Sequence, residues 1–185
     1  MAHFEKELEK TQLYQGKIFT LTAHRVQLED GGESRRDVVN HHGGSCVAAV
    51  DDKGRILLVR QYRFAAGREL LELPAGKLEP GEDPMEAAAR ELTEETGCTA
   101  GYLTKLTEII PTPAYCTEHI YVYEAHSLSA SGGQHLDQDE FLDVVLVPLE
   151  EAVGMVLAGE LPDAKTQVGV LLMAAKRGIF PHPEE

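Results

Sequence analysis

The 185-residue sequence lacks the features of membrane and secreted proteins. No apolar run approaches the ~18 residues that a membrane-spanning helix requires. The first ten residues, MAHFEKELEK, have no apolar core of the kind found in secretory signals, so we expect a cytoplasmic protein. The length and a hydrophobic content of 43% fit one soluble globular domain with a sizeable core.

The cysteine and histidine patterns of zinc sites are also missing. Cys46, Cys98 and Cys116 are widely spaced and form no Cys-x-x-Cys pair. No two histidines have the His-x-x-x-His spacing that places two imidazoles on one helix face. We therefore expect neither a disulfide framework nor a zinc site.

Basic residues are scarce. There are 17 lysines and arginines against 31 aspartates and glutamates, which gives a net charge of −14. This balance argues against nucleic acid as a partner. A phosphate-containing substrate would need a local arginine cluster or a divalent metal ion to bind such an acidic protein.

The pattern of apolar residues predicts an α/β fold. Residues 18–28 and 35–40 flank the turn signal EDGGES and predict an N-terminal β-hairpin. The apolar stretches 46–50 and 55–60 flank Asp-Asp-Lys-Gly and predict a second hairpin, whose strands are buried on both faces. Further strands are expected over 103–110, 119–126 and 141–149, and helices over about 150–158 and 163–177.

A helix over 84–96 has the clearest end signals. Asp83 suits the N-cap, Pro84 the first helical position and Gly97 the position after the last turn. Glu86, three residues after the cap, completes a capping pattern.

The acidic residues of this helix have two interpretations. The predicted core face consists of Met85, Ala89, Leu92 and Thr96. Glu91, Glu94 and Glu95 lie roughly 130° away from that face, in the last turns, where the helix dipole disfavours negative charge. They form either a solvated face, with Arg90 bridging Glu86 and Glu94, or a site for a hard divalent cation such as Mg²⁺.

The segment from Gly76 to Cys98, GKLEPGEDPMEAAARELTEETGC, resembles the Nudix box without a gap. The nine specified positions are Gly76, Glu82, Arg90, Glu91, Leu92, Glu94, Glu95, Gly97 and the apolar Cys98. The resemblance implies a hydrolase of nucleoside diphosphates linked to another group, with an α/β/α sandwich around a mixed sheet. We expect an N-terminal β arm over 1–42, used for dimerisation, and a Nudix domain over 43–185.

The same resemblance implies a metal site. The implied ligands are the backbone carbonyl of Ala75 and the carboxylates of Glu91, Glu94 and Glu95, with Glu94 binding directly or through water. Glu82 and Arg90 match the supporting acid and base of the box and, with Glu94, are expected to serve catalysis. Two or three Mg²⁺ ions, with Mn²⁺ as the alternative, would neutralise a pyrophosphate and acidify the attacking water.

Outside the box, most of the chain resembles the ADP-ribose pyrophosphatase branch of the family. The resemblance is carried by RQYR at 60–63, ELLELPAGKLEPGE at 69–82, LDQDEFLDV at 136–144 and Pro113. It implies Mg²⁺-dependent hydrolysis of ADP-ribose to AMP and ribose 5-phosphate by a homodimer. In that branch a loop glutamate is the general base, and Glu140 has the matching position; Asp139 and Glu118 are alternatives.

Four further residues are candidates for substrate binding. Arg63 matches a phosphate-binding arginine, and Arg36 matches one that some members supply across a dimer interface. Glu72 either binds the base or ribose or supports the sheet edge. Pro113 is followed by Ala114 and Tyr115, whereas the branch commonly has Pro-Gly, and this departure leaves the preferred terminal sugar open.

Two other functions remain as alternatives. One is hydrolysis of other ADP-sugars, dinucleotides or damaged nucleoside triphosphates. The other is a nucleotide-binding Nudix module without turnover. The complete set of box carboxylates argues against the second alternative, because a binding module has no need to retain all of them.

Overall fold

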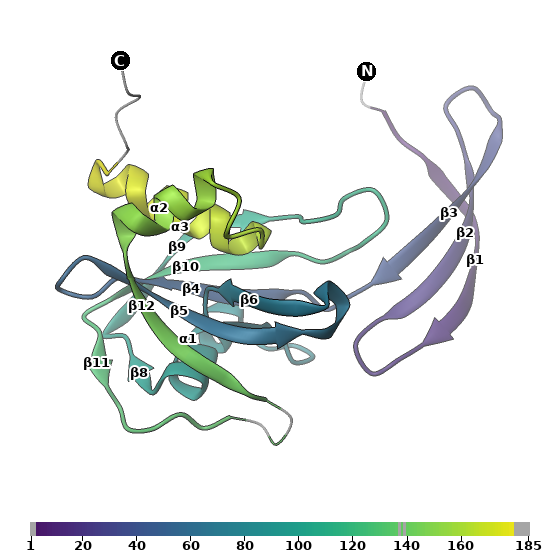
Figure 1. Cartoon of the computed structure of the whole chain (residues 1–185). Coiled ribbons are helices and arrows are strands. Elements are labelled where there is room, and N and C mark those ends of the chain that lie inside the picture. The colour runs from purple at the N-terminus through teal and green to yellow at the C-terminus, as the bar shows by residue number, and fades with distance from the viewer. Residues whose placement is uncertain (1–2, 137, 139, 180–185) are drawn as a thin grey trace, which may run out of the picture. The chain divides into compact units, whose positions relative to one another are not determined.

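The computed structural model describes residues 3–136, 138 and 140–179 (Figure 1). The chain forms two compact units. Unit 1 comprises Met1–Gly43 and Ile110–His119, and unit 2 comprises Gly44–Ile109 and Ile120–Glu185. The segment Ile110–His119, which the sequence analysis places in the Nudix domain, therefore groups with the N-terminal residues.

Unit 1 is a three-stranded antiparallel sheet in the order β1-β2-β3. The predicted hairpin is β2 (Thr20–Gln27) and β3 (Glu33–Asn40). The sequence analysis missed β1 (Lys6–Gln15), because all its side chains are exposed and no apolar alternation marks it. Backbone hydrogen bonds join Val39 to the segment Ile110–His119: its N–H donates to Tyr115 O (2.8 Å) and its carbonyl accepts from Thr117 N (3.0 Å).

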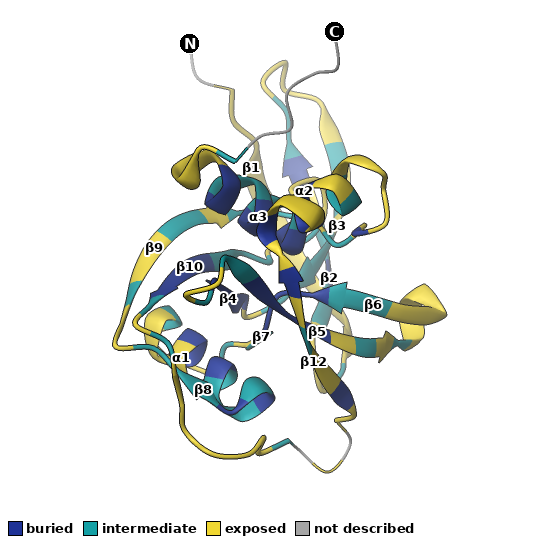
Figure 2. Cartoon of the chain, turned by 60° about the vertical axis from the view of Figure 1, so that its left-hand side comes forward, coloured by how far each residue is buried: buried dark blue, intermediate teal, exposed yellow. Residues whose placement is uncertain are grey.

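Unit 2 is an α/β/α sandwich around mixed sheets, as predicted (Figures 1 and 2). One sheet has the order β7-β4-β10-β9 and another the order β12-β5-β6; β4 and β10 are parallel and the other pairs antiparallel. Helix α1 lies on one side of the sheets and α2 and α3 on the other. The strands are β4 (Gly44–Ala49), β5 (Arg55–Arg63), β6 (Arg68–Glu72), β7 (Ala75–Lys77), β8 (Cys98–Thr99), β9 (Tyr102–Ile109), β10 (Ile120–His126), β11 (Ser129–Ala130) and β12 (Leu142–Pro148). The helices are α1 (Pro84–Thr96), α2 (Leu149–Leu157) and α3 (Ala164–Arg177), with a short 3₁₀ turn at Phe64–Ala66.

The second predicted hairpin is wrong beyond its turn. Asp51 N–H donates to Arg55 O (2.9 Å), and Val50 pairs with Ile56 in an isolated bridge. Past that bridge, β4 and β5 enter different sheets. Their side chains are apolar on both faces, so the sequence shows burial correctly but carries no information on which strand is the neighbour.

The core lies on both faces of β4. Cys46 and Ala48 pack in the apolar cluster beneath α2 and α3, whereas Val47 and Ala49 pack in the cluster beneath α1. This alternation follows the two-residue period of a strand.

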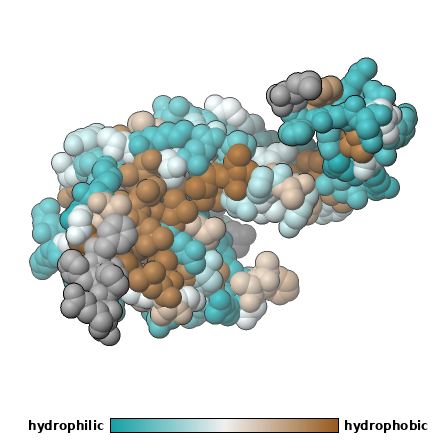
Figure 3. All heavy atoms as spheres, turned by 90° about the horizontal axis from the view of Figure 1, so that it is seen from above, coloured by the Kyte–Doolittle hydropathy of each residue, from teal (hydrophilic) through white to brown (hydrophobic). Residues whose placement is uncertain are grey.

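Apolar side chains also gather on the outer side of α2 and α3 (Figure 3), where Leu157 is exposed. In the described part of the chain, no helix is long and apolar enough to cross a membrane.

Helix α1 has the predicted ends, but of the four residues of the predicted core face only Leu92 is buried. Asp83 Oδ1 accepts hydrogen bonds from Met85 N (2.8 Å) and Glu86 N (3.3 Å), and Gly97 ends the helix with φ of +66°. Met85 is 43% exposed, while Ala87, Ala88, Leu92 and Glu95 are buried. Ala88, Leu92 and Glu95 are spaced by four and three residues, so Glu95 lies on the buried face of the helix.

Candidate active site

Arg90 is the centre of a cluster of carboxylates on α1. Its Nε donates to Glu82 Oε1 (3.0 Å), and its Nη1 donates to Glu91 Oε1 (2.7 Å) and Glu94 Oε2 (3.0 Å). The structure thus gives Arg90 the partner Glu82 where helical spacing predicts Glu86. The hydrogen bond from Arg90 lowers the pKa of Glu82, and the hydrogen bond to Glu82 raises that of Arg90, so both groups are charged at neutral pH.

Glu95 is a buried carboxylate, only 3% exposed. Its Oε2 accepts a hydrogen bond from the N–H of Ala75 (2.9 Å), which joins α1 to the start of β7. Burial raises the pKa of Glu95 to about 8, and the negative charges of Glu91 and Glu140 act in the same direction. A cation beside this carboxylate would have the opposite effect.

The Glu91 carboxylate lies directly against Gly76, in space that a side chain at position 76 would occupy. A Cβ atom at Gly76 would lie 1.8 Å from Glu91 Oε1 and 2.0 Å from its Cδ. Any other residue at this position would therefore displace the carboxylate. Glu91 is largely enclosed, with a side-chain exposure of 12%, and burial raises its pKa.

The carboxylates do not form a ligand set in this structure. Among the described residues, no group of three or more His, Cys, Asp or Glu side chains is arranged to hold a metal ion. Arg90 binds one oxygen each of Glu91 and Glu94, and Ala75 N binds one oxygen of Glu95.

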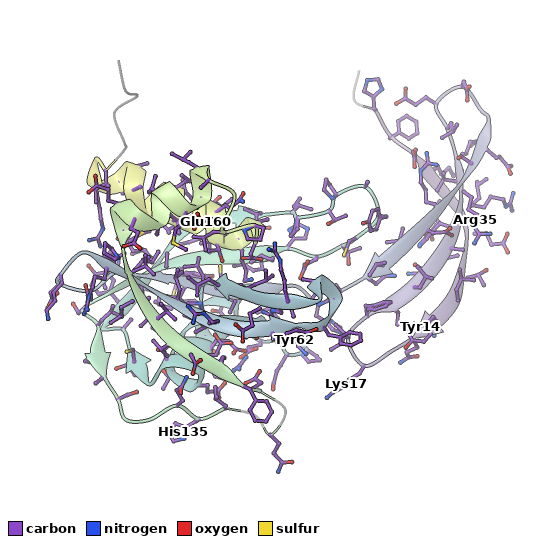
Figure 4. The ribbon with its side chains drawn as sticks, in the orientation of Figure 1. Tyr14, Lys17, Arg35, Tyr62, His135 and Glu160 are labelled. Carbon is purple, nitrogen blue, oxygen red and sulfur yellow. The ribbon has the colours of Figure 1, made fainter. Side chains whose placement is uncertain are left out.

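The loop that carries Glu140 is anchored on the C-terminal end of α1. The backbone N–H groups of Ser131 and His135 donate to Gly97 O and Glu94 O (2.8 Å each), so the loop satisfies carbonyls that a helix end leaves unpaired. His135 lies in this loop on the α1 side of the sheet (Figure 4). The Glu140 charge contributes to the raised pKa values of Glu91 and Glu95, as expected for a neighbouring carboxylate.

The two alternative bases are placed differently. Glu118 belongs to unit 1, whereas Glu140 and the α1 carboxylates belong to unit 2. Asp139 lies outside the described residues.

Arg63 and Glu72 form a two-bond ion pair at the ends of β5 and β6. Arg63 Nε and Nη2 donate to Glu72 Oε1 (2.7 Å) and Oε2 (2.8 Å). Lys165 Nζ also donates to Glu72 Oε2 and lies 3.0 Å from Asp163 Oδ2. Burial of Glu72 opposes its ionisation, but the hydrogen bonds and charges of Arg63 and Lys165 outweigh this effect and lower its pKa to about 2.

Lys165 is a further residue of this cluster, and no motif in the sequence points to it. It is 8% exposed and stands in the first turn of α3, where the helix dipole disfavours a positive charge. That position was the available signal: a lysine two residues after the N-cap Asp163 needs a nearby anion.

Arg36 and Pro113 both lie in unit 1. Arg36 Nε donates to Glu5 Oε2 (3.0 Å), and Nη1 donates to Ser34 Oγ (2.8 Å). Pro113 lies in a turn closed by the bond from Cys116 N–H to Thr112 O (3.0 Å). The other candidates described above, apart from Glu118, belong to unit 2.

Comparison with known proteins shows similarity over most of the chain. Residues 40–168 match the sequence profile of the NUDIX domain. The chain is 41% identical over 176 residues to the ADP-ribose pyrophosphatase of Bacillus subtilis (strain 168), covering 95% of each protein. It is 36% identical over 167 residues to the methanol dehydrogenase activator of Bacillus methanolicus, covering 90% of each. In structure it resembles an ADP compounds hydrolase, with a TM-score of 0.82, 21% identity and coverage of 95% of this chain and 97% of the other.

Proposed function

This chain belongs to the Nudix hydrolases, in the branch of the ADP-ribose pyrophosphatases, and from that premise we propose that it hydrolyses ADP-ribose to AMP and ribose 5-phosphate. It is a Nudix pyrophosphohydrolase. The observation that supports the substrate most strongly is the 41% identity to an ADP-ribose pyrophosphatase over 95% of both proteins. The substrate is thus a small nucleoside diphosphate sugar.

The acidic cluster has the chemistry of a magnesium site. Glu91 lies in space that only glycine leaves open, and Glu95 is buried with a raised pKa that a cation would lower. Carboxylate and carbonyl oxygens are the ligands that Mg²⁺ prefers. In this proposal the Ala75 carbonyl, Glu91, Glu94 and Glu95 hold the metal. Bound Mg²⁺ or Mn²⁺, with two or three ions in the site, supplies charge neutralisation of the pyrophosphate and a more acidic attacking water.

The protein groups around the metal ligands have separate tasks. Arg90, held by Glu82, orients the carboxylates of Glu91 and Glu94 through its hydrogen bonds. Glu140, on its anchored loop, accepts the proton of the attacking water. Glu140 is favoured over Glu118 as the base, because the hydrogen bonds from Ser131 and His135 tie the loop that carries Glu140 to the end of α1.

Arg63 binds a phosphate of the substrate in this proposal. Its two bonds to Glu72 use Nε and Nη2, and within the described part of the chain Nη1 makes no hydrogen bond. Guanidinium groups suit phosphate oxygens because their donors are fixed in one plane. Both oxygens of the buried Glu72 already accept hydrogen bonds, so we assign Glu72 to holding Arg63 rather than to the base or ribose.

A panel of substrates tests the function. ADP-ribose, ADP-glucose, NADH, diadenosine polyphosphates and 8-oxo-dGTP are compared at saturating Mg²⁺, with identification of the products. We expect the highest kcat/KM for ADP-ribose and the products AMP and ribose 5-phosphate. The panel is needed because a relative at 36% identity bears the name of a methanol dehydrogenase activator. A kcat/KM for ADP-ribose no greater than for the other compounds would overturn the proposed substrate, and no turnover of any compound would favour the binding module.

Unit 1 is proposed to pair with a second copy of the chain. Among its described residues, Val26 is the one large apolar side chain that is buried, and Leu13, Tyr14 and Ile18 are exposed. A sheet with so little core of its own needs a partner surface to bury these side chains. Arg36 would then contribute to the partner's site. Light scattering of the purified protein should give twice the mass of one chain, and a fully active monomer would contradict the proposal.

A further inference from the structure

The first turn of α3 is built around the Arg63–Glu72 pair. Glu72 is 2% exposed and Lys165 is 8% exposed, so their ion pair is inside the protein. Buried charges of this kind must have partners, and each of the two has two: Glu72 contacts Arg63 and Lys165, and Lys165 contacts Glu72 and Asp163. Arg63, in contrast, keeps a side-chain exposure of 42%.

The backbone beside Glu72 is held by the same turn of α3. Thr166 Oγ1 accepts a hydrogen bond from the Leu73 N–H (2.9 Å) and donates to Asp163 Oδ2 (2.6 Å). One turn further along α3, Gly169 lies so close to Leu73 that a Cβ atom on the glycine would be 2.4 Å from Leu73 Cδ1. Helix α3 therefore fixes both the side chain of Glu72 and the peptide that follows it.

The segment fixed by α3 leads directly to the carboxylate cluster. Leu73 and Pro74 connect Glu72 to Ala75, whose N–H donates to Glu95 Oε2 (2.9 Å). The charge of Glu95 contributes to the raised pKa of Arg63, after the larger effect of Glu72. The segment 72–75 thus contacts Arg63 at its first residue and the proposed metal ligand Glu95 at its last.

We propose that Lys165 is a positioning residue for substrate binding, which acts through Glu72 on the guanidinium of Arg63. This inference rests on the proposed role of Arg63 in binding a substrate phosphate. Arg63 bonds to both oxygens of Glu72, and Lys165 bonds to Oε2 as well, so Lys165 adds a third hydrogen bond that limits rotation of the carboxylate on which Arg63 rests. Without Lys165, the carboxylate and Arg63 would rotate together, and the guanidinium would lose its fixed orientation. The positive charge of Lys165 also offsets the charge of Glu72, which would otherwise weaken the attraction of Arg63 for phosphate.

Lys165→Met tests the inference, with Lys176→Met as its matched control. Both lysines belong to α3 and both contact a buried carboxylate, Glu72 in one case and Glu124 in the other. We expect Lys165→Met to raise the KM for ADP-ribose roughly tenfold with little change in kcat, as for the loss of one charged hydrogen bond that positions a binding group. Lys176→Met should leave KM unchanged. An equal change in KM for both variants, or none for Lys165→Met, would overturn the inference.

A double-mutant cycle separates positioning from general stability. In an Arg63→Ala background, Lys165→Met should have little further effect on KM, because the group that it positions is gone. An additional tenfold rise there would show that Lys165 does not act through Arg63. If Arg63→Ala alone leaves KM unchanged, the proposed role of Arg63 fails, and this result is distinct from the failure of Lys165.

Two further variants separate the effect on substrate binding from an effect on folding. Lys165→Arg keeps the positive charge, so its KM for ADP-ribose should stay close to the wild-type value. Lys165→Gln keeps a donor for Glu72 without the charge and replaces Lys165→Met if that variant does not fold. Thermal unfolding of each variant is recorded beside KM. A KM that follows the unfolding temperature in all variants, Lys176→Met included, would mean a structural role only.

Discussion

Glu95→Gln is expected to lower kcat by about three orders of magnitude while the protein stays folded. The carboxylate is proposed as a metal ligand, and the loss of one preorganised electrostatic group in an active site typically costs 10²–10³-fold or more. The glutamine keeps the size of the side chain and an oxygen that can accept the hydrogen bond from Ala75 N–H. Its effect should therefore appear in catalysis and not in the temperature of unfolding.

Titration of activity with Mg²⁺ distinguishes a ligand from a base. Glu95→Gln should require a higher Mg²⁺ concentration for half-maximal activity. Glu140→Gln should lower kcat by about 10²–10⁴-fold, as for the loss of a general base, with an unchanged Mg²⁺ requirement. Glu86→Gln is the control, since Glu86 is an exposed acid in the first turn of the same helix. Near-normal turnover by Glu95→Gln would refute its role as a ligand.

The fold could be predicted from the sequence where local chemistry decides the structure. Asp83, Pro84 and Gly97 each act on the backbone next to them, and α1 begins and ends where they indicate. Pairing between strands depends on distant partners, and this explains the errors. β1 is polar and held by backbone hydrogen bonds, and the buried strands β4 and β5 have no side-chain pattern that specifies a neighbour.

For the candidate site, the sequence singles out the carboxylates of α1 but does not show which of them is buried. The Nudix box identifies Glu91, Glu94 and Glu95 as a group. The core face predicted from the sequence runs through Met85, Ala89 and Leu92, and Glu95 lies outside it. In the structure Glu95 is on the buried face of α1, because Ala88 and Leu92, seven and three residues before it, are buried on the same side of the helix. The position of Lys165 in the first turn of α3 indicates that it needs an anion, but not which one, since its partner Glu72 is 93 residues away in the chain.

Gly76→Ala is expected to lower kcat/KM by about 10²-fold, with little change in stability. The added Cβ would lie 1.8 Å from Glu91 Oε1, and the atoms in its way belong to the end of a flexible side chain rather than to the backbone. The chain can therefore accommodate alanine by moving the carboxylate. The displacement exceeds the ~1 Å that is enough to cost 10²-fold when a group in an active site is misplaced.

The test of Gly76→Ala is whether activity and stability separate. Half-maximal activity should need more Mg²⁺ than in the wild type, while the unfolding temperature stays close to the wild-type value. Gly154→Ala in α2 is the matched control, because a Cβ there would meet no atom within 4 Å. That variant should keep full activity, since the same methyl group is added where it displaces no other atom. If Gly76→Ala hydrolyses ADP-ribose normally at low Mg²⁺, catalysis does not depend on the position of the Glu91 carboxylate beside Gly76, and the proposed role of Glu91 as a ligand is contradicted.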